Sequence, residues 1–205
     1  MDAPPSISDS DPNVGQAFST IGLRKLDADT RAFALVGSFM GHFALLEGGI
    51  NDALAKSLGL KGAKAAIVCR NMSFDDKIKS LRTLINLVVV DTVLAKNFEK
   101  LSKEAQTCGA TRNIAAHTPF RASPTTDGVE FFVIEAKSKL RVTEMDWSVE
   151  DFMSKIDNIR QIDNGIRAIE DTLSPQRFAE ALSELRVLPS PLAMMYASVE
   201  EPSPE

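Results

Sequence analysis

The chain has 205 residues, of which 44% are hydrophobic and 25% charged, and its formal net charge at pH 7 is −5. These proportions are those of a globular protein with one sizeable core. A protein that coats nucleic acid would normally be basic, because phosphate contacts supply most of its affinity. The composition therefore excludes that class but leaves room for a local phosphate site.

The sequence predicts neither a leader nor a metal site. The start of the chain is acidic and polar, unlike a secretory signal, and no run of eighteen apolar residues predicts a membrane span. We therefore expect a cytoplasmic protein without membrane contact. Cys69 and Cys108 lack metal-type spacing and have apolar neighbours, so reduced core thiols are expected, with a disulfide as the alternative. With two histidines and scattered carboxylates, no metal and no cofactor is predicted.

Two polar tails, 1–20 and 188–205, are predicted to be disordered because Pro, Ser and acidic residues dominate them. Residues 21–187 are predicted to form one helical domain. Its first long helix spans about 29–58, and Gly59 is its expected stop. The apolar stripe of this helix advances by three or four residues at each step. Its members are Phe33, Val36, Phe39, Phe43, Leu46, Ile50, Leu54 and Leu58.

Two shorter helices follow. Residues 62–71 form the first, and Asn71-Met72-Ser73 interrupts it. Ser73, with Asp76 three residues later, is the predicted N-cap of the next helix, in which Phe74, Ile78, Leu81, Ile85 and Val88 form the apolar stripe.

A helix that begins near residue 91 carries the most informative motif, Arg112-Asn113-Ile114-Ala115-Ala116-His117. Arg112 falls in the apolar seam, where an arginine is costly unless it is paired or faces a cavity or an interface. Asn113 and His117 are four residues apart and share a helical face. Pro119 ends the helix.

A small β-hairpin insert at about 119–143 is predicted next. Val129 to Ile134 is β-branched and aromatic and follows the turn dipeptide Asp127-Gly128; 139–142 is its expected partner, and 120–122 a third short strand. A last long helix follows a cap formed by Ser148 and Asp151. Its stripe is Val149, Phe152, Ile156, Ile159, Ile162, Ile166, Ile169 and Leu173, and a short helix at 174–186 ends the domain. The predicted fold is all-α, an antiparallel bundle of four to five main helices with this insert after the motif helix.

The helix order and the motif resemble those of the HEPN superfamily (higher eukaryotes and prokaryotes nucleotide-binding domain). The hallmark of that superfamily is an arginine, a polar residue and a histidine near a helix end, here Arg112, Asn113 and His117. The resemblance covers roughly residues 29–173. It implies a homodimer joined through the motif helices, with a composite site across the two-fold axis. For active members it implies a metal-independent RNA endonuclease, a hydrolase often used as a toxin or defence factor with a neutralising antitoxin or regulatory protein.

The residue types suit that chemistry. His117 is suited to act as general base on the 2′-hydroxyl or as general acid on the leaving 5′-oxygen. Arg112 is suited to hold the phosphoryl oxygens, and Asn113 to orient the histidine or the phosphate. Glu47 and Asn51, one turn apart on the first long helix, are supporting candidates: Glu47 would pair with Arg112 or fix the imidazole.

Two other readings stay open. Cations near a helix C-terminus are favourable by roughly 0.3–1 kcal/mol without any function. The chain would then be a non-catalytic dimeric binding or scaffolding module of the same fold, with Arg112 and His117 stabilising the interface. Alternatively, Arg112 would bind a phosphate without cleavage in a nucleotide-binding regulatory module. His42 is expected to have a packing or hydrogen-bonding role.

Overall fold

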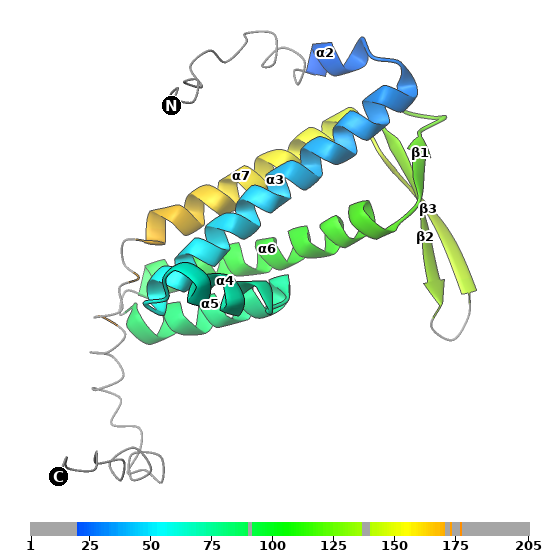
Figure 1. Cartoon of the computed structure of the whole chain (residues 1–205). Coiled ribbons are helices and arrows are strands. Elements are labelled where there is room, and N and C mark those ends of the chain that lie inside the picture. The colour runs from blue at the N-terminus through cyan, green and yellow to red at the C-terminus, as the bar shows by residue number, and fades with distance from the viewer. Residues whose placement is uncertain (1–19, 90–91, 137–139, 171–172, 174–176, 178–205) are drawn as a thin grey trace, which may run out of the picture. The chain divides into compact units, whose positions relative to one another are not determined.

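The computed structural model describes residues 20–89, 92–136 and 140–170, together with residues 173 and 177. Six helices and one antiparallel sheet occur in this part of the chain (Figure 1). The helices are α2 (Thr20–Arg24), α3 (Ala28–Ser57), α4 (Gly62–Arg70), α5 (Phe74–Val88), α6 (Thr92–His117) and α7 (Val149–Glu170). The strands are β1 (Phe120–Ala122), β2 (Val129–Ala136) and β3 (Leu140–Trp147). The prediction of a mainly helical chain with a small β insert after the motif helix is confirmed.

The chain divides into two compact units. The first, Met1–Gly48 with Lys103–Asn164, contains α2, most of α3, the end of α6, the sheet and most of α7. The second, Gly49–Ser102 with Gly165–Glu205, contains α4, α5 and the remaining parts of the three long helices. The predicted tails, apart from Thr20, and the helix predicted at 174–186, apart from Arg177, lie outside the described residues.

An aromatic cluster forms the core of the first unit. Phe152 of α7 is fully buried, and its ring centroid lies 5.5 Å from that of Trp147 and 6.4 Å from those of Phe39 and Phe131. All eight members of the predicted α7 stripe, from Val149 to Leu173, are buried. The stripe therefore identified the inward face of this helix correctly.

The predicted stripe of α3 is wrong at its two ends. Phe33 is 68% exposed and Leu58 is 46% exposed, whereas Leu35, which was not in the stripe, is fully buried. The first steps of the stripe are both three residues long, so Phe33 lies about 120° around the helix from Phe39. Leu58 lies beyond the last residue of α3, which is Ser57.

The sheet has the strand order β1-β2-β3 with antiparallel pairing throughout. The third strand predicted at 120–122 is confirmed as β1. β3 runs to Trp147, so the predicted end of the insert at 143 is too early. Trp147 pairs with Val129 in register and both side chains are buried in the core, which extends the strand beyond the predicted end.

Gly128 fills a position where only hydrogen fits. A Cβ there would lie 1.8 Å from the Trp147 backbone oxygen and 2.7 Å from the Ser148 Cα. Gly128→Ala should therefore force β2 away from the end of β3 and reduce the free energy of unfolding by about 3 kcal/mol or more. Denaturant unfolding measures this change. Gly48→Ala is the control: a Cβ on this helical glycine meets nothing within 4 Å, so stability should stay constant or rise by about 0.5–1 kcal/mol.

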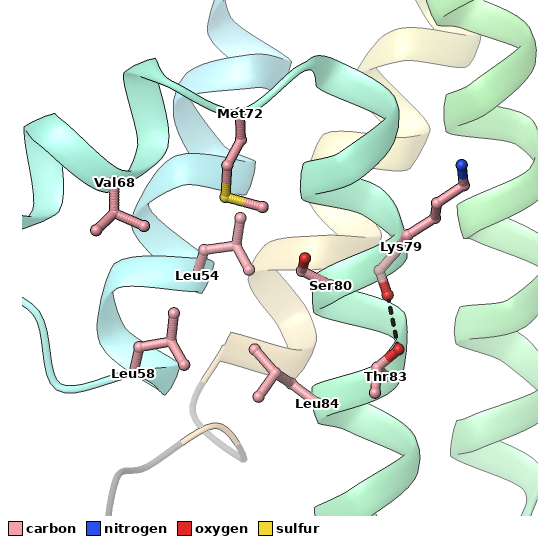
Figure 2. Close-up of a pocket in the computed structure, with 8 residues that line it drawn as sticks. All are labelled: Leu54, Leu58, Val68, Met72, Lys79, Ser80, Thr83 and Leu84. Carbon is pink, nitrogen blue, oxygen red and sulfur yellow. Dashed lines mark hydrogen bonds between the residues drawn. The ribbon is translucent and has the colours of Figure 1, made fainter.

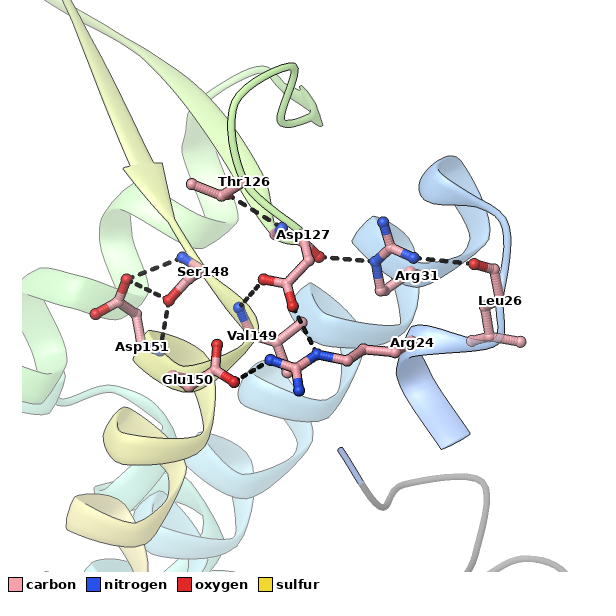
Figure 3. A network of polar contacts seen from close by, with 10 residues as sticks. Arg24, Leu26, Arg31, Thr126, Asp127, Ser148, Val149, Glu150 and Asp151 are labelled. Atoms are coloured by element: carbon pink, nitrogen blue, oxygen red, sulfur yellow. Dashed lines mark hydrogen bonds and ion pairs between the residues drawn. The ribbon is translucent and has the colours of Figure 1, made fainter. Parts of the chain in front are cut away.

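Charged hydrogen bonds join α2 to the loop between β1 and β2 and to the start of α7 (Figure 3). Arg24 Nε donates to Asp127 Oδ2 at 2.9 Å, and Arg24 also pairs with Glu150. Arg31 Nε donates to the Asp127 carbonyl oxygen at 2.7 Å, while Asp127 Oδ1 accepts from the backbone N–H of Val149 at 3.2 Å. Asp127 thus does more than begin a turn, since it joins three segments of the first unit.

Asp146 organises the loop between β1 and β2. Its carboxylate accepts hydrogen bonds from the hydroxyls of Ser123, Thr125 and Thr126, the last two at 2.7 Å. Partial burial raises the pKa of Asp146, but these hydrogen bonds outweigh burial and hold the pKa below its usual value. Because the pKa is lowered in the folded state, the Asp146 carboxylate stabilises the fold at pH values above its unfolded-state pKa of about 3.9. This stabilisation is lost as the pH falls through the folded-state pKa.

Asp146→Asn should consequently lower stability at pH 7 by about 1–2 kcal/mol, because hydrogen bonds to a charged acceptor are lost. Its difference from the natural protein should shrink as the pH falls below about 4. Urea unfolding at a series of pH values measures both effects. Asp52→Asn, at an exposed position of α3, is the control and should track the natural protein. A constant difference between the Asp146→Asn and natural proteins across the whole pH range would contradict the assignment.

In the second unit, α3 ends and α5 begins at the stop and cap residues that the sequence predicted. Gly59 has a φ of 64°, and Leu60 N–H donates to the Ala55 carbonyl at 2.8 Å, which is the Schellman ending of α3. Ser73 caps α5: its hydroxyl accepts from Asp76 N–H at 3.2 Å and donates to Asp76 Oδ2 at 2.6 Å. These contacts confirm the predicted break between α4 and α5.

The second unit also contains a mostly apolar pocket of about 410 Å³ between α3, α4 and α5 (Figure 2). Its lining residues are Leu54, Leu58, Val68, Met72, Lys79, Ser80, Thr83 and Leu84. The Thr83 hydroxyl donates to the Lys79 carbonyl, and Lys79 Nζ pairs with Asp75 at 2.5 Å. The predicted site residues Arg112, Asn113 and His117 belong to the other unit, so this pocket is not part of their site.

Of the described helices, α3 is long and apolar enough to cross a membrane by length and composition alone. Core helices of soluble proteins and signal sequences meet the same criterion, so it does not assign a location to the chain. The expectation of a cytoplasmic protein without membrane contact stays a prediction.

Candidate functional site

Arg112 lies in the last turns of α6 with its side chain half-buried. Its guanidinium carbon is 5.7 Å from the centre of the Phe43 ring on α3, a cation–π contact within the first unit. The Nε atom is buried and has no hydrogen-bond partner among the described residues. An unpaired guanidinium nitrogen away from water is costly. The hydrogen-bonding capacity of the Arg112 guanidinium is therefore only partly used among the described residues.

Asn113 and His117 complete the motif on exposed helical positions. Asn113 Oδ1 accepts a hydrogen bond from Arg112 Nη1 at 3.2 Å, so the structure brings these two side chains together. His117 is the last residue of α6, one turn beyond Asn113, and its ring makes no hydrogen bond to any residue that the structure describes. The imidazole is therefore accessible, and no hydrogen bond from the described residues fixes its orientation.

The two supporting candidates fall in different units. Glu47 is half-buried on α3, one turn beyond Phe43, the residue whose ring the Arg112 guanidinium contacts. Asn51 belongs to the second unit, where its carbonyl oxygen accepts from Cys69 Sγ at 3.7 Å. The Asn51 side-chain Oδ1 is buried without a hydrogen-bond partner among the described residues. Glu47 therefore belongs to the same unit as the motif and Asn51 to the other unit.

His42 takes part in a polar network that the sequence reading did not identify. Its Nδ1 lies 2.8 Å from the Ser38 carbonyl oxygen, and its Nε2 lies 3.0 Å from Arg160 Nη2 on α7. A guanidinium can only donate and a carbonyl can only accept, so Nε2 accepts and Nδ1 carries the hydrogen. Arg160 Nη1 also pairs with Asp157 at 3.1 Å. His42 thus links α3 to α7, in agreement with its expected hydrogen-bonding role.

The contacts of this network that lie within one helix have spacings that the sequence shows. Ser38 and His42 are four residues apart, and Asp157 and Arg160 are three apart, which are spacings that allow contact along a helix. The bond between His42 and Arg160 joins residues 118 positions apart. Only the packing of the two helices shows it.

Both cysteines are free and buried, as the sequence predicted. Burial raises the pKa of the Cys108 thiol, although a hydrogen bond from Asn158 Nδ2 to its sulfur, at 3.4 Å, acts in the opposite direction. Such a thiol is a poor nucleophile at neutral pH. Within the described ranges, no group of three or more His, Cys, Asp or Glu side chains is placed to hold a metal ion.

Taken together, one chain presents a cation, an amide and an accessible imidazole on the end of one helix. The cation and amide can bind an anionic oxygen, and the imidazole can transfer a proton. Transesterification of RNA needs both a base and an acid, and one chain offers a single histidine at this place. The arrangement is thus half of the site that such a reaction needs.

Comparison with protein-family models gave no match, and comparisons with characterised proteins and with solved structures gave none either.

Proposed function

We propose that this chain is a metal-independent RNA endonuclease of HEPN type that acts as a homodimer. The observation that carries the proposal is the Arg112–Asn113–His117 group at the end of α6. Asn113 and His117 are exposed, and the half-buried arginine contacts Asn113, while its buried Nε has no partner among the described residues. A second copy related by a two-fold axis would bring two arginines and two histidines to one site. The finer description of the fold as an antiparallel helical bundle belongs to the same proposal.

The reaction follows from these groups. One His117 removes the proton from the 2′-hydroxyl, the 2′-oxygen forms a bond to phosphorus, and the bond from phosphorus to the 5′-oxygen breaks. The second His117 gives a proton to the leaving 5′-oxygen, which leaves a 2′,3′-cyclic phosphate and a 5′-hydroxyl. The Arg112 guanidinium stabilises the extra negative charge on the phosphoryl oxygens. Asn113, held against Arg112, orients the phosphate. The nucleophile belongs to the RNA, so this route requires no metal.

Arg112→Ala should lower the cleavage rate by at least about 10²-fold, the scale seen when a transition-state donor is removed. Arg112→Lys should recover part of the loss, because it restores charge without the planar fork. The measurement is single-turnover cleavage of a mixed single-stranded RNA pool in EDTA, with circular dichroism to check folding. Arg121→Ala, which removes a cation that pairs with Glu130 on the sheet, is the matched control. Equal rates for the Arg112→Ala and natural proteins would contradict the proposed role.

A second candidate is a non-catalytic dimeric binding or scaffolding module of the same fold. The contact of Arg112 with Phe43 favours it, because this contact would stabilise α6 against α3 without any chemistry. The net charge of −5 also suits a protein or nucleotide partner better than a long RNA. A nucleotide-binding regulatory module would use Arg112 and Asn113 for a phosphate. A folded dimer that cleaves no RNA in EDTA would favour these alternatives.

The biological setting forms part of the same proposal. A ribonuclease of this kind in the cytoplasm would act as a toxin or defence factor, and an antitoxin or regulatory protein would have to neutralise it. Co-purification of an inhibitory protein with the natural chain, and its release by denaturant with recovery of cleavage, would test this setting.

A further inference from the structure

The outward face of α3 has an unusual composition. No Asp, Glu, Lys or Arg occurs between Arg31 and Glu47, a stretch of fifteen residues. A helix at the surface of a soluble protein normally carries charged residues on its solvent face. Here Phe33 and Leu45 are 68% and 65% exposed, and only 39% of the most apolar part of α3 is buried. The helix is therefore apolar on its outer as well as its inner side.

Small residues form the middle of this outer face, which we call the α3 outer face. Its members are Phe33, Ala34, Gly37, Gly41, Ala44, Leu45 and Gly48, all of them exposed or half-exposed. At about 100° per residue, Gly37 and Gly41 lie about 160–200° from the buried Phe39. A Cβ at either glycine would meet nothing within 4 Å, so no residue of the described part of the chain fills the space above them. Another backbone can approach closely there.

The pattern is symmetric about position 39. Gly37 and Gly41 are each two residues from that position, and Phe33 and Leu45 are each six residues from it. In an antiparallel pair of α3 helices with the two-fold axis at residue 39, each Gly37 therefore lies opposite the partner's Gly41. Phe33 and the partner's Leu45 then lie at the same level, on opposite sides of the glycines. Antiparallel helix dipoles favour this orientation over a parallel one.

We propose that the α3 outer face is a self-association surface that binds the α3 outer face of a second copy of this chain in antiparallel orientation. The absence of charge argues against nucleic acid and against charged protein partners, since neither would find a complementary group there. The two-fold pattern argues for an identical partner. The proposal does not rest on ribonuclease activity.

The face is small. Residues 33–48 span about 24 Å of helix, and a helix is about 10 Å wide, so one helix pair buries far less than the roughly 800 Å² per partner of a stable interface. The contact is consequently weak and depends on protein concentration. It is also separate from the contact proposed at Arg112, because Phe43, which touches Arg112, lies on the opposite side of α3 from Gly41. The two contacts together would join catalytic dimers into larger assemblies.

Cysteine cross-linking tests the orientation. Full-length Gly37→Cys and Gly41→Cys proteins are oxidised alone and as an equal mixture; the native cysteines are buried and so should not compete. An antiparallel pair predicts several-fold more cross-linked dimer in the mixture than in either protein alone. More cross-linking in the separate proteins than in the mixture would mean a parallel pair and overturn the proposal. No cross-linking in any sample would overturn it as well.

A charge placed in the face tests the contact itself. Leu45→Glu should raise the concentration at which the larger species forms in sedimentation by about tenfold or more, because the contact would bury an unpaired carboxylate. Lys64→Glu, at an exposed position of α4, is the control and should have no effect. RNA cleavage, if present, should be equal in all these proteins, so failure here is distinguishable from failure of the ribonuclease proposal. Flotation of the natural chain with vesicles of equal phosphatidylcholine and phosphatidylglycerol, abolished by Leu45→Glu, would show a membrane surface as the occupant and overturn the proposal.

Discussion

Replacement of His117 by alanine should abolish RNA cleavage while leaving the fold intact. A positioned general acid or base contributes about 10²–10⁴-fold to the rate, and in a two-fold site the substitution removes both the acid and the base. The loss should lie at the upper end of that range. Stability should change little, because His117 is exposed at the end of α6 and its ring makes no hydrogen bond to any described residue. Single-turnover cleavage and thermal unfolding measure the two quantities.

The other histidine provides a matched control. His42→Ala removes hydrogen bonds to the Ser38 carbonyl and to Arg160, so it should destabilise the chain by about 1–2 kcal/mol. It should leave the cleavage rate of the folded protein within a few-fold of the natural value. Loss of activity with His42→Ala but not with His117→Ala would move the site from the end of α6 to the pair of α3 and α7.

Replacement of Phe152 by alanine should cause the largest loss of stability, about 3–5 kcal/mol. The ring is fully buried and lies within 6.4 Å of the rings of Phe39, Phe131 and Trp147, counted between centroids. Its removal leaves a cavity where α3, α7 and the sheet meet in the first unit. Because ordinary domains have a total stability of about 5–15 kcal/mol, this variant should be near the limit of folding. Denaturant unfolding followed by Trp147 fluorescence measures the loss.

Phe33→Ala is the control for Phe152→Ala. Phe33 is 68% exposed, and its ring lies 5.2 Å from the Phe120 ring on the edge strand β1. Its loss should therefore cost no more than about 1 kcal/mol. Equal losses for the two phenylalanines would mean that the aromatic cluster is not the core of this unit.

Local signals in the sequence were sufficient for most helix ends. The caps at Ser73 and Ser148 and the stop at Gly59 depend on residues within a few positions of one another, and the structure contains all three. The α7 stripe could be predicted because each of its steps is three or four residues, the spacing of an amphipathic helix. The outward position of Phe33 was missed because the same spacing reaches it, and spacing alone does not show where a stripe leaves the core.

Features that depend on packing between distant segments could not be predicted. The turn dipeptide at Gly128 indicated a bend, but the reason for the glycine is the Trp147 backbone, nineteen positions away in the chain. Glu47 was a candidate to pair with Arg112 or to fix the imidazole, and the structure places the arginine over Phe43, one turn earlier on α3. Two residues one turn apart on a helix can both face a neighbouring helix. The relative shift of the two helices along their axes decides which of them makes the contact, and sequence periodicity does not determine that shift.

The ends of the RNA products test the ribonuclease proposal most directly. The purified natural chain, incubated in EDTA with a mixed single-stranded RNA pool and with total tRNA, should give fragments that carry 2′,3′-cyclic phosphates and 5′-hydroxyls. Those ends are the products of attack by the 2′-hydroxyl with proton transfer by His117. Fragments with 5′-phosphates, or a folded dimer that leaves both RNA pools intact, would contradict the account and favour a binding module.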